Sequence, residues 1–206
     1  MMNSSPKNNK PYPKLTVSIL GYRPDLLQIT VNSLIPHLSK IPDWDMVILN
    51  HSGTQQEGMN KLVEMWDGEF LLHCQDDWFF FPQPDCKSDW INWGIEILEK
   101  YPEVRYIVLR VDSDRDCSTT IVKEVEPNGM IVKGLGFQLA PFIARTETVK
   151  RVLKVVAEDK EDITFSRKCF RAAYNLGLNG ASAKLKLWDK GSCVHIGRGF
   201  HFKLNV

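Results

Sequence analysis

The sequence has no apolar run that approaches the ~20 residues of a membrane-spanning helix, so we expect no transmembrane segment. It also has no excess of charge of one sign, because 26 basic residues face 25 acidic ones and the formal net charge is +1. A chain of this balance lacks the overall field that drives binding to nucleic acid, and we expect no nucleic-acid partner. Partners therefore have to be argued from individual sites.

Cysteine is sparse and unpatterned. The five cysteines are odd in number and widely spaced, and none forms a C-x-x-C pair. This spacing suggests neither a disulfide framework nor a zinc cluster, and it fits a reducing compartment. The first 13 residues are polar and lack the apolar core of a signal peptide. We expect a flexible arm over residues 1–13, a single soluble domain over residues 14–206, and a cytoplasmic location.

The apolar content is 43%, with ten Phe and six Trp, which is ample for one core. Apolar segments of strand length alternate with segments of helical period over the first ~80 residues, which favours parallel strands joined by right-handed crossovers. The expected strands here are Leu15–Leu20, Asp45–Leu49 and the segment that ends at Asp76. The first expected helix runs from Asp25 to Leu38, with Pro24 in its first turn, and Pro36 and Pro42 close the segment. The second expected helix has Met59, Leu62, Val63 and Trp66 on one face, and Gly68 lies just past its end as a C-terminal cap.

The second half of the sequence predicts a mixed pattern. Two segments alternate across Pro127-Asn128-Gly129, which is typical of an antiparallel hairpin. The expected strands are Tyr106–Leu109, Thr119–Val125, Met130–Val132, Gln138–Ala144 and Leu185–Trp188. The expected helices are Ser88–Lys100, a helix with Thr146 as N-cap through Val156, and Ile163–Leu176 before Gly177, and Gly191–Gly199 is expected to be a loop. The fold class is therefore α/β, with a mostly parallel central sheet flanked by helices and a small antiparallel part towards the C-terminus.

In the stretch Glu69–Phe81, an apolar run of strand length ends in two adjacent carboxylates, Asp76 and Asp77. Ligands of open α/β sheets bind at the carboxyl ends of the strands, where such a pair can hold a divalent cation against a phosphorylated ligand. The alternative is that these acids only cap a helix or close a turn. The aromatic segment Trp78–Phe81 that follows is no helix start, and adjacent carboxylates repel each other unless a cation or strong donors compensate. This favours a metal site, while most of the aromatic side chains are expected to pack in the core.

A second acidic pair, Glu161-Asp162, precedes the last predicted helix. Acidic residues at a helix start complement its dipole, and Asp162 would serve as a simple N-cap. A carboxylate fixed there beside a crevice would equally serve as a general base towards an attacking hydroxyl. Both interpretations stay open on the sequence alone.

A late glycine-bearing segment holds His195 and Arg198. Imidazole beside carboxylates suits Mn²⁺ better than Mg²⁺, and an arginine can meet a phosphate. A lone histidine is more often a surface or core residue, and a lone arginine is more often a solvated cation. The segment Asp112-Ser113-Asp114 has a calcium-type spacing but lacks the rest of an EF-hand loop, so we interpret it as a loop.

Together these residues resemble the GT-A fold glycosyltransferases, in particular the inverting family-2 enzymes, over nearly the whole chain from Leu15 to Arg198. The stretches that carry the resemblance are Thr16–Arg23 with Leu26-Leu27 and Asn32-Ser33-Leu34, Gly58 and Asn60 with Gly68-Glu69-Phe70, Gln75-Asp76-Asp77, Glu161-Asp162, and His195. The chain also resembles the small glycosyltransferase domains that chlorella viruses encode.

The resemblance implies a role for each matching residue. Asp77 takes the place of the metal-binding aspartate of the Asp-x-Asp motif, and His195 lies where many of these enzymes supply a late histidine to the ion, which would be Mn²⁺ or Mg²⁺. Asp162, or failing it Glu161, matches the catalytic base. The residues implied in donor binding are Gly21, Tyr22, Arg23, Asn50, Asn60, Asp76 and Arg198.

The chain departs from the family pattern at two positions. Gln75 replaces the first acid of Asp-x-Asp, which leaves the role of Asp76 open, and Asn50 replaces the aspartate that commonly meets uracil. The Gln-x-x-Arg-Trp signature of processive enzymes is absent, so polymer synthesis is not expected.

The resemblance implies a metal-dependent transfer of a sugar, with inversion, from a nucleoside diphosphate sugar to a hydroxyl of a glycan acceptor. A UDP-sugar is the first donor expected. Two alternatives stay open. One is a non-catalytic module that binds nucleotide or carbohydrate. The other is a metal-dependent sugar nucleotidyltransferase, although no Gly-rich triphosphate loop with a lysine follows the first strand.

Overall fold

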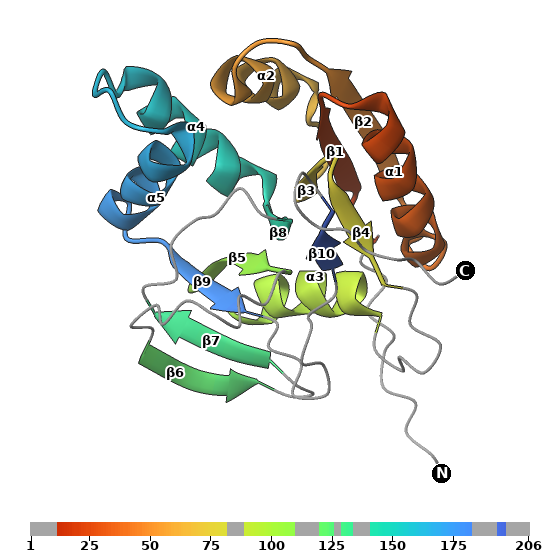
Figure 1. The fold of residues 1–206 in the computed structure, drawn as a ribbon. Helices are drawn as coiled ribbons and strands as arrows, with labels where there is room; N and C mark the ends of the chain where they lie inside the picture. Colours follow the sequence, from red (N-terminus) through yellow and green to blue (C-terminus); the bar gives the residue numbers. More distant parts are fainter. Residues whose placement is uncertain are drawn as a thin grey trace.

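The computed structural model describes residues 12–81, 89–109, 120–125, 129–133, 141–182 and 193–196. Its centre is an eight-stranded sheet with the strand order β2-β1-β3-β8-β5-β9-β7-β6 (Figure 1). Strands β2, β1, β3, β5, β9 and β6 point one way, and β8 and β7 run against them. The expected α/β class, a mostly parallel sheet flanked by helices, is confirmed.

The strands of the large sheet are β1 (Leu15–Gly21), β2 (Trp44–Asn50), β3 (Phe70–Gln75), β5 (Val104–Val108), β6 (Thr120–Val125), β7 (Gly129–Lys133), β8 (Phe142–Arg145) and β9 (Asn179–Ser182). A separate small sheet pairs β4 (Trp78–Phe80) with β10 (Cys193–His195). The helices are α1 (Pro24–Leu38), α2 (Gln55–Leu62), the 3-10 turn η1 (Val63–Met65), α3 (Trp90–Lys100), α4 (Thr146–Glu158) and α5 (Phe165–Asn175).

The sheet separates two apolar clusters, which makes the described part of the chain a three-layer sandwich. One cluster joins α1 and α3 to one face, through residues such as Leu34, Trp90 and Val17. The other joins α2, α4 and α5 to the opposite face, through residues such as Met59 and Val152. Because successive side chains of a strand point to opposite faces, a strand buried on both faces is apolar throughout. Figure 1 shows α1 on one side of the sheet and the α4–α5 pair on the other.

Several local predictions are confirmed. Pro24 is the first residue of α1, where its missing N–H costs no helical hydrogen bond. Helix α5 is followed by Gly177, which has a φ of +64° and so takes the left-handed conformation that favours glycine. Strands β6 and β7 pair antiparallel, as the hairpin pattern predicted, and the turn at 126–128 lies outside the described residues.

Other local predictions are wrong. Thr146 is the first residue of α4 and not its N-cap, which is Arg145. The last helix begins two residues later than expected, because the side chain of Thr164 caps it by accepting from the backbone N–H of Arg167. Pro36 lies inside the last turn of α1 and does not end it. The segment 191–199 is not wholly a loop, since Cys193–His195 forms β10.

The rest of the expected pattern has mixed outcomes. The helix predicted over Ser88–Lys100 is α3, and strands β4 and β9 were not expected from the sequence. The predicted strand Leu185–Trp188, the Asp112-Ser113-Asp114 segment and residues 1–11 of the predicted arm lie outside the described residues. No helix within the described ranges combines the length and the apolar character needed to cross a bilayer.

Candidate functional site

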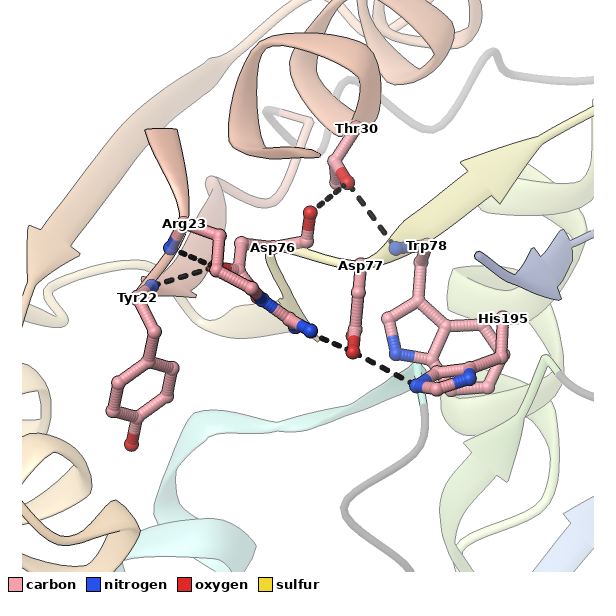
Figure 2. Close-up of polar contacts among 7 residues, drawn as sticks. All are labelled: Tyr22, Arg23, Thr30, Asp76, Asp77, Trp78 and His195. Atoms are coloured by element: carbon pink, nitrogen blue, oxygen red, sulfur yellow. Dashed lines mark hydrogen bonds and ion pairs between the residues drawn. The ribbon is translucent and has the colours of Figure 1, made fainter. Parts of the chain in front are cut away.

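The adjacent carboxylates lie in the turn that joins β3 to β4, beside the turn that joins β1 to α1 (Figure 2). Strands β1 and β3 are parallel neighbours with Leu20 opposite Gln75, so both turns leave the same edge of the sheet. The backbone N–H of Asp76 continues this pairing by donating to the carbonyl oxygen of Leu20, at 3.1 Å. This is the edge at which open α/β sheets bind their ligands.

Asp76 is fully buried, and both of its carboxylate oxygens have protein partners. Its Oδ2 accepts hydrogen bonds from the backbone N–H of Tyr22, at 2.6 Å, and from the backbone N–H of Arg23. Its Oδ1 accepts from Nη2 of Arg23, at 2.7 Å. The carboxylate therefore fixes the β1–α1 turn, and both of its oxygens are occupied by these hydrogen bonds.

Asp77 is 6% exposed and differs from its neighbour in how its oxygens are satisfied. Its Oδ2 lies 2.6 Å from Nη2 of Arg23 and 2.8 Å from Nε2 of His195. Its Oδ1 is buried and has no hydrogen-bond partner among the described residues. A buried acceptor without a donor is costly, so this oxygen marks a place where a cation or a donor from a ligand would stabilise the site.

His195 reaches the site from a distant part of the sequence. Strand β10 pairs antiparallel with β4, which places His195 opposite Trp78. The backbone N–H of Ile196 donates to the carbonyl oxygen of Asp77 at 2.8 Å, and the His195 ring meets the Trp78 ring edge-on at a centroid distance of 5.2 Å. The side chain is 39% exposed, so it borders the protein surface.

Arg23 carries the positive charge of the site. Its hydrogen bond to Asp76, reinforced by Asp77, raises the pKa of the guanidinium even though partial burial acts to lower it. The adjacent Tyr22 is half-buried, and its burial, with the negative charge of Asp76, raises the pKa of the phenol. Figure 2 shows the Arg23 side chain reaching past Asp76 to Asp77. Arg23 is therefore a cation and Tyr22 is neutral at physiological pH.

Helix α1 holds the carboxylate turn through two hydroxyl groups that the sequence analysis did not single out. Thr30 donates to the carbonyl oxygen of Asp76 at 2.7 Å and accepts from the backbone N–H of Trp78 at 3.2 Å. Ser33 accepts from the backbone N–H of Phe80 at 3.1 Å. The available signal was a polar residue within the apolar stripe of a helix, since Thr30 lies between Leu27 and Leu34 at helical spacing. Thr30 is fully buried.

Two of the four aromatic residues after the carboxylates pack in the core, and the other two are half-buried. Trp78 and Phe80 are buried, and the Phe80 ring stacks on Trp90 of α3 at a centroid distance of 5.7 Å. The β3–β4 turn is therefore anchored from both sides, by α1 hydroxyl groups and by core rings. A turn held in this way keeps its carboxylates in one geometry, which is what a binding site requires.

The second acidic pair lies in the turn between α4 and α5, and both side chains are exposed. Glu161 pairs with Nη1 of Arg171 at 2.5 Å, and Asp159 pairs with the same guanidinium, which lowers the pKa of Asp159. Asp162 makes no hydrogen bond or ion pair with the residues that the structure describes. No such contact joins this turn to Asp77 within the same ranges, so the carboxylate of Asp162 is free to meet a ligand.

The remaining predicted site residues occupy different places. Asn50 is exposed at the end of β2 and faces Gly21, since a Cβ on that glycine would lie 2.9 Å from Oδ1 of Asn50. Asn60 is exposed on α2. Arg198 lies outside the described residues. The structure thus brings together Gly21, Tyr22, Arg23, Asp76, Asp77 and His195, with Asn50 beside Gly21.

Asp77 and His195 are the described side chains that could hold a cation, since His195 Nε2 lies 2.8 Å from Asp77 Oδ2. Within the described ranges no group of three or more His, Cys, Asp or Glu side chains is placed to hold a metal ion. The unpartnered Oδ1 of Asp77 and the adjacent imidazole nevertheless fit an ion that keeps part of its coordination for ligand oxygens. Mixed carboxylate and imidazole donors suit Mn²⁺ better than Mg²⁺.

No protein-family model and no curated protein matches this sequence. A solved structure of a mutant Drosophila β1,4-galactosyltransferase 7 in complex with manganese, UDP-Gal and xylobiose is similar, with a TM-score of 0.55 and 11% identity over 92% of this chain and 74% of that chain. The structure of residues 1–349 of TarS from S. aureus is similar with a TM-score of 0.50 and 14% identity, over 87% of this chain and 59% of that chain. The chain has the GT-A, Rossmann-like fold. The resemblance to chlorella-virus domains stays a prediction.

Proposed function

We propose that this protein is a metal-dependent glycosyltransferase that transfers a sugar from a nucleoside diphosphate sugar to a hydroxyl group of a glycan acceptor, with inversion. The observation that carries the proposal is the cluster of Arg23, Asp77 and His195 at the carboxyl edge of a GT-A sheet. Three chain segments far apart in sequence contribute a guanidinium, a buried carboxylate and an imidazole, which meet at Oδ2 of Asp77.

Asp77 and His195 are the residues that would hold Mn²⁺ or Mg²⁺, and the ion would supply positive charge to the diphosphate that leaves. The other positive charge comes from the chain itself, since Arg23 stays protonated beside this position. Preorganised charge at a site where negative charge develops lowers the barrier of the transfer. Arg198 is proposed as a further phosphate contact.

The donor nucleoside is proposed to lie along the ends of β1 and β2, against Gly21, Tyr22, Asn50 and Asn60. Gly21 permits a close approach there, because a Cβ at this position would crowd the Asn50 side chain. A UDP-sugar is the first donor to test. The Drosophila neighbour binds UDP-Gal and xylobiose, which gives an initial donor and acceptor pair for assay.

Asp162 is proposed as the general base, with Glu161 as the alternative. In the reaction the acceptor oxygen forms a bond to the anomeric carbon while the bond from that carbon to the diphosphate oxygen breaks. The acceptor proton passes to the carboxylate, and the electron pair of the broken bond leaves with the nucleoside diphosphate. Asp162 suits this role because its carboxylate is exposed and unpaired among the described residues, whereas Glu161 is held by Arg171.

The test measures both binding and turnover. Calorimetry with a panel of nucleotide sugars, each with Mn²⁺, Mg²⁺ or EDTA, should give one base-selective and metal-dependent ligand. With that donor and a panel of glycan acceptors, release of the nucleoside diphosphate should require the metal and should be lost in Asp77→Ala. Metal-dependent binding with no turnover on any acceptor would favour the non-catalytic module. Release of pyrophosphate from a nucleoside triphosphate and a sugar 1-phosphate would favour the nucleotidyltransferase.

A further inference from the structure

The guanidinium of Arg23 occupies the position between the two carboxylates. Its Nη2 lies 2.7 Å from Oδ1 of Asp76 and 2.6 Å from Oδ2 of Asp77. Two adjacent buried carboxylates repel each other, and one positive nitrogen bridging them removes most of that cost. A divalent ion bound at Asp77 would neutralise the same carboxylate that Arg23 neutralises now.

The two carboxylates depend on Arg23 to different degrees. Asp76 keeps two backbone N–H donors, from Tyr22 and Arg23, whatever the Arg23 side chain does. The carboxylate of Asp77 has only side-chain partners among the described residues, because its Oδ2 pairs with Arg23 and His195 and its Oδ1 has no partner. Losing the guanidinium therefore leaves Asp76 in place and leaves Asp77 short of a cation.

The Arg23 side chain is also placed to move. It is 33% exposed, and its Nε has no partner among the described residues. Its two ion pairs both use Nη2, so the same nitrogen must leave both carboxylates together. The backbone of Arg23 stays fixed meanwhile, because it is the N-cap of α1 and donates to Asp76.

We propose that Arg23 is an exchangeable counter-cation that neutralises Asp77 until a divalent ion binds, and that then turns to the diphosphate of the donor. The proposal rests on the proposed function for the ion and the diphosphate. Arg23 then acts on the two ligands in opposite directions. It opposes binding of the ion alone, and it strengthens binding of the nucleotide once the ion is in place.

The decisive variant is Arg23→Gln, with Arg145→Gln as the matched control. Arg145 has a similar exposure of 29% and a similar ion pair, to Glu69 at 3.0 Å, but it lies at the opposite end of β3. Calorimetry measures the affinity for Mn²⁺ without nucleotide, and then the affinity for UDP at saturating Mn²⁺. The melting temperature of each variant shows that it is folded.

Arg23→Gln should bind Mn²⁺ alone about tenfold more tightly than the unmodified protein, which corresponds to one charge-assisted hydrogen bond no longer competing for Asp77. The same variant should bind UDP at saturating Mn²⁺ about tenfold more weakly, because the diphosphate loses a cation. Arg145→Gln should change neither affinity. Arg23→Lys, which keeps the charge but is more strongly hydrated and lacks the planar fork, should also bind Mn²⁺ more tightly than the unmodified protein.

Arg23→Lys carries the test if Arg23→Gln does not fold. Mn²⁺ affinity that stays equal or falls in the folded Arg23 variants overturns the inference, and so does an unchanged UDP affinity of Arg23→Gln. If the unmodified protein binds Mn²⁺ and UDP in these cases, the proposed function survives and only the inference fails. If no variant binds Mn²⁺ at millimolar concentration, with or without UDP, the metal dependence of the proposed function fails and the inference fails with it.

Discussion

The Thr30 hydroxyl donates a hydrogen bond to the backbone carbonyl oxygen of Asp76 at 2.7 Å, which ties the first helix to the turn that carries both carboxylates. The Thr30 Oγ1 also accepts from the backbone N–H of Trp78, so one side chain satisfies two buried backbone groups on either side of Asp77. Among the described residues, Thr30 makes no hydrogen bond to the carboxylate oxygens or to the imidazole. It positions them.

Replacing Thr30 by Val should lower the free energy of unfolding by about 2 kcal/mol, because a buried carbonyl and a buried N–H lose their partner. Urea unfolding measures this. The control is Thr146→Val, which removes a buried hydroxyl that has no partner among the described residues and should change stability little. Equal losses in the two variants would show that the Thr30 hydrogen bonds contribute nothing specific. Mn²⁺ affinity should also fall in Thr30→Val, because the turn that holds Asp77 is loosened.

His73 should make the protein sensitive to acid. It is fully buried on β3, and burial lowers its pKa to about 3, although a hydrogen bond with the backbone of Ser18 acts to raise it. The folded state therefore keeps this imidazole neutral, whereas the unfolded chain takes up a proton below a pH of about 6.5. Stability should fall as the pH drops from about 6.5 towards about 3, by about 1 kcal/mol per pH unit from this group alone.

The measurement is the urea midpoint at a series of pH values for the unmodified protein and for His73→Gln. Carboxylates contribute to the acid slope of both proteins, so the difference between the two slopes isolates His73. The slope of His73→Gln should be flatter between pH 6 and pH 4. Parallel slopes would mean that the imidazole is protonated in the folded state.

Asp162→Asn and Glu161→Gln separate the two candidate bases. Asp162→Asn should reduce turnover by roughly 10²–10⁴-fold with donor affinity unchanged, since a general base contributes about that factor. Glu161→Gln should lose only an exposed ion pair with Arg171, worth less than about 1 kcal/mol, and should keep its turnover. Steady-state kinetics on an identified donor and acceptor measures both. The reverse result would move the base to Glu161, and full activity in both variants would remove this turn from the mechanism.

Alanine at Gly68 or Gly177 should lower the stability of the protein, for a different reason and by a different amount at each position. A Cβ at Gly68 would lie 2.7 Å from the backbone nitrogen of Thr16, which cannot move without disturbing β1, so Gly68→Ala should cost about 2 kcal/mol. Gly177 has open space around it but a φ of +64°, so Gly177→Ala should cost only about 1 kcal/mol of backbone strain. Thermal unfolding ranks the two variants. A larger loss at Gly177 would contradict this order.

Patterns of apolar residues over short stretches predicted many of the strands and helices. The mostly apolar runs of β1 and β3 indicated buried strands, and their alternation with helical stretches indicated parallel pairing, which β1, β2 and β3 confirm. These features depend on neighbours within a few residues. Boundaries were less accurate at Thr146 and Ile163, because α4 begins at Thr146 itself and α5 begins after the N-cap Thr164.

The sequence placed Asp76 and Asp77 at a ligand-binding edge, but it could not tell them apart. The structure distinguishes them through groups that no local pattern links to them, namely two backbone N–H groups of the β1–α1 turn, the Arg23 guanidinium and His195. Strand β4 was not expected, so the pairing of β4 with β10 that brings His195 to Asp77 could not be predicted.

The α/β class, the buried strands and the position of the acids after β3 follow from local sequence, because side-chain period and residue type act over short distances. The roles of the two acids depend on the folded chain: both oxygens of Asp76 are occupied by hydrogen bonds, whereas Asp77 keeps one buried oxygen without a partner among the described residues. The physical reason is that the partner of a carboxylate is set by strand order and by pairings between distant segments. Those pairings form only when the apolar faces of the helices are buried against the sheet.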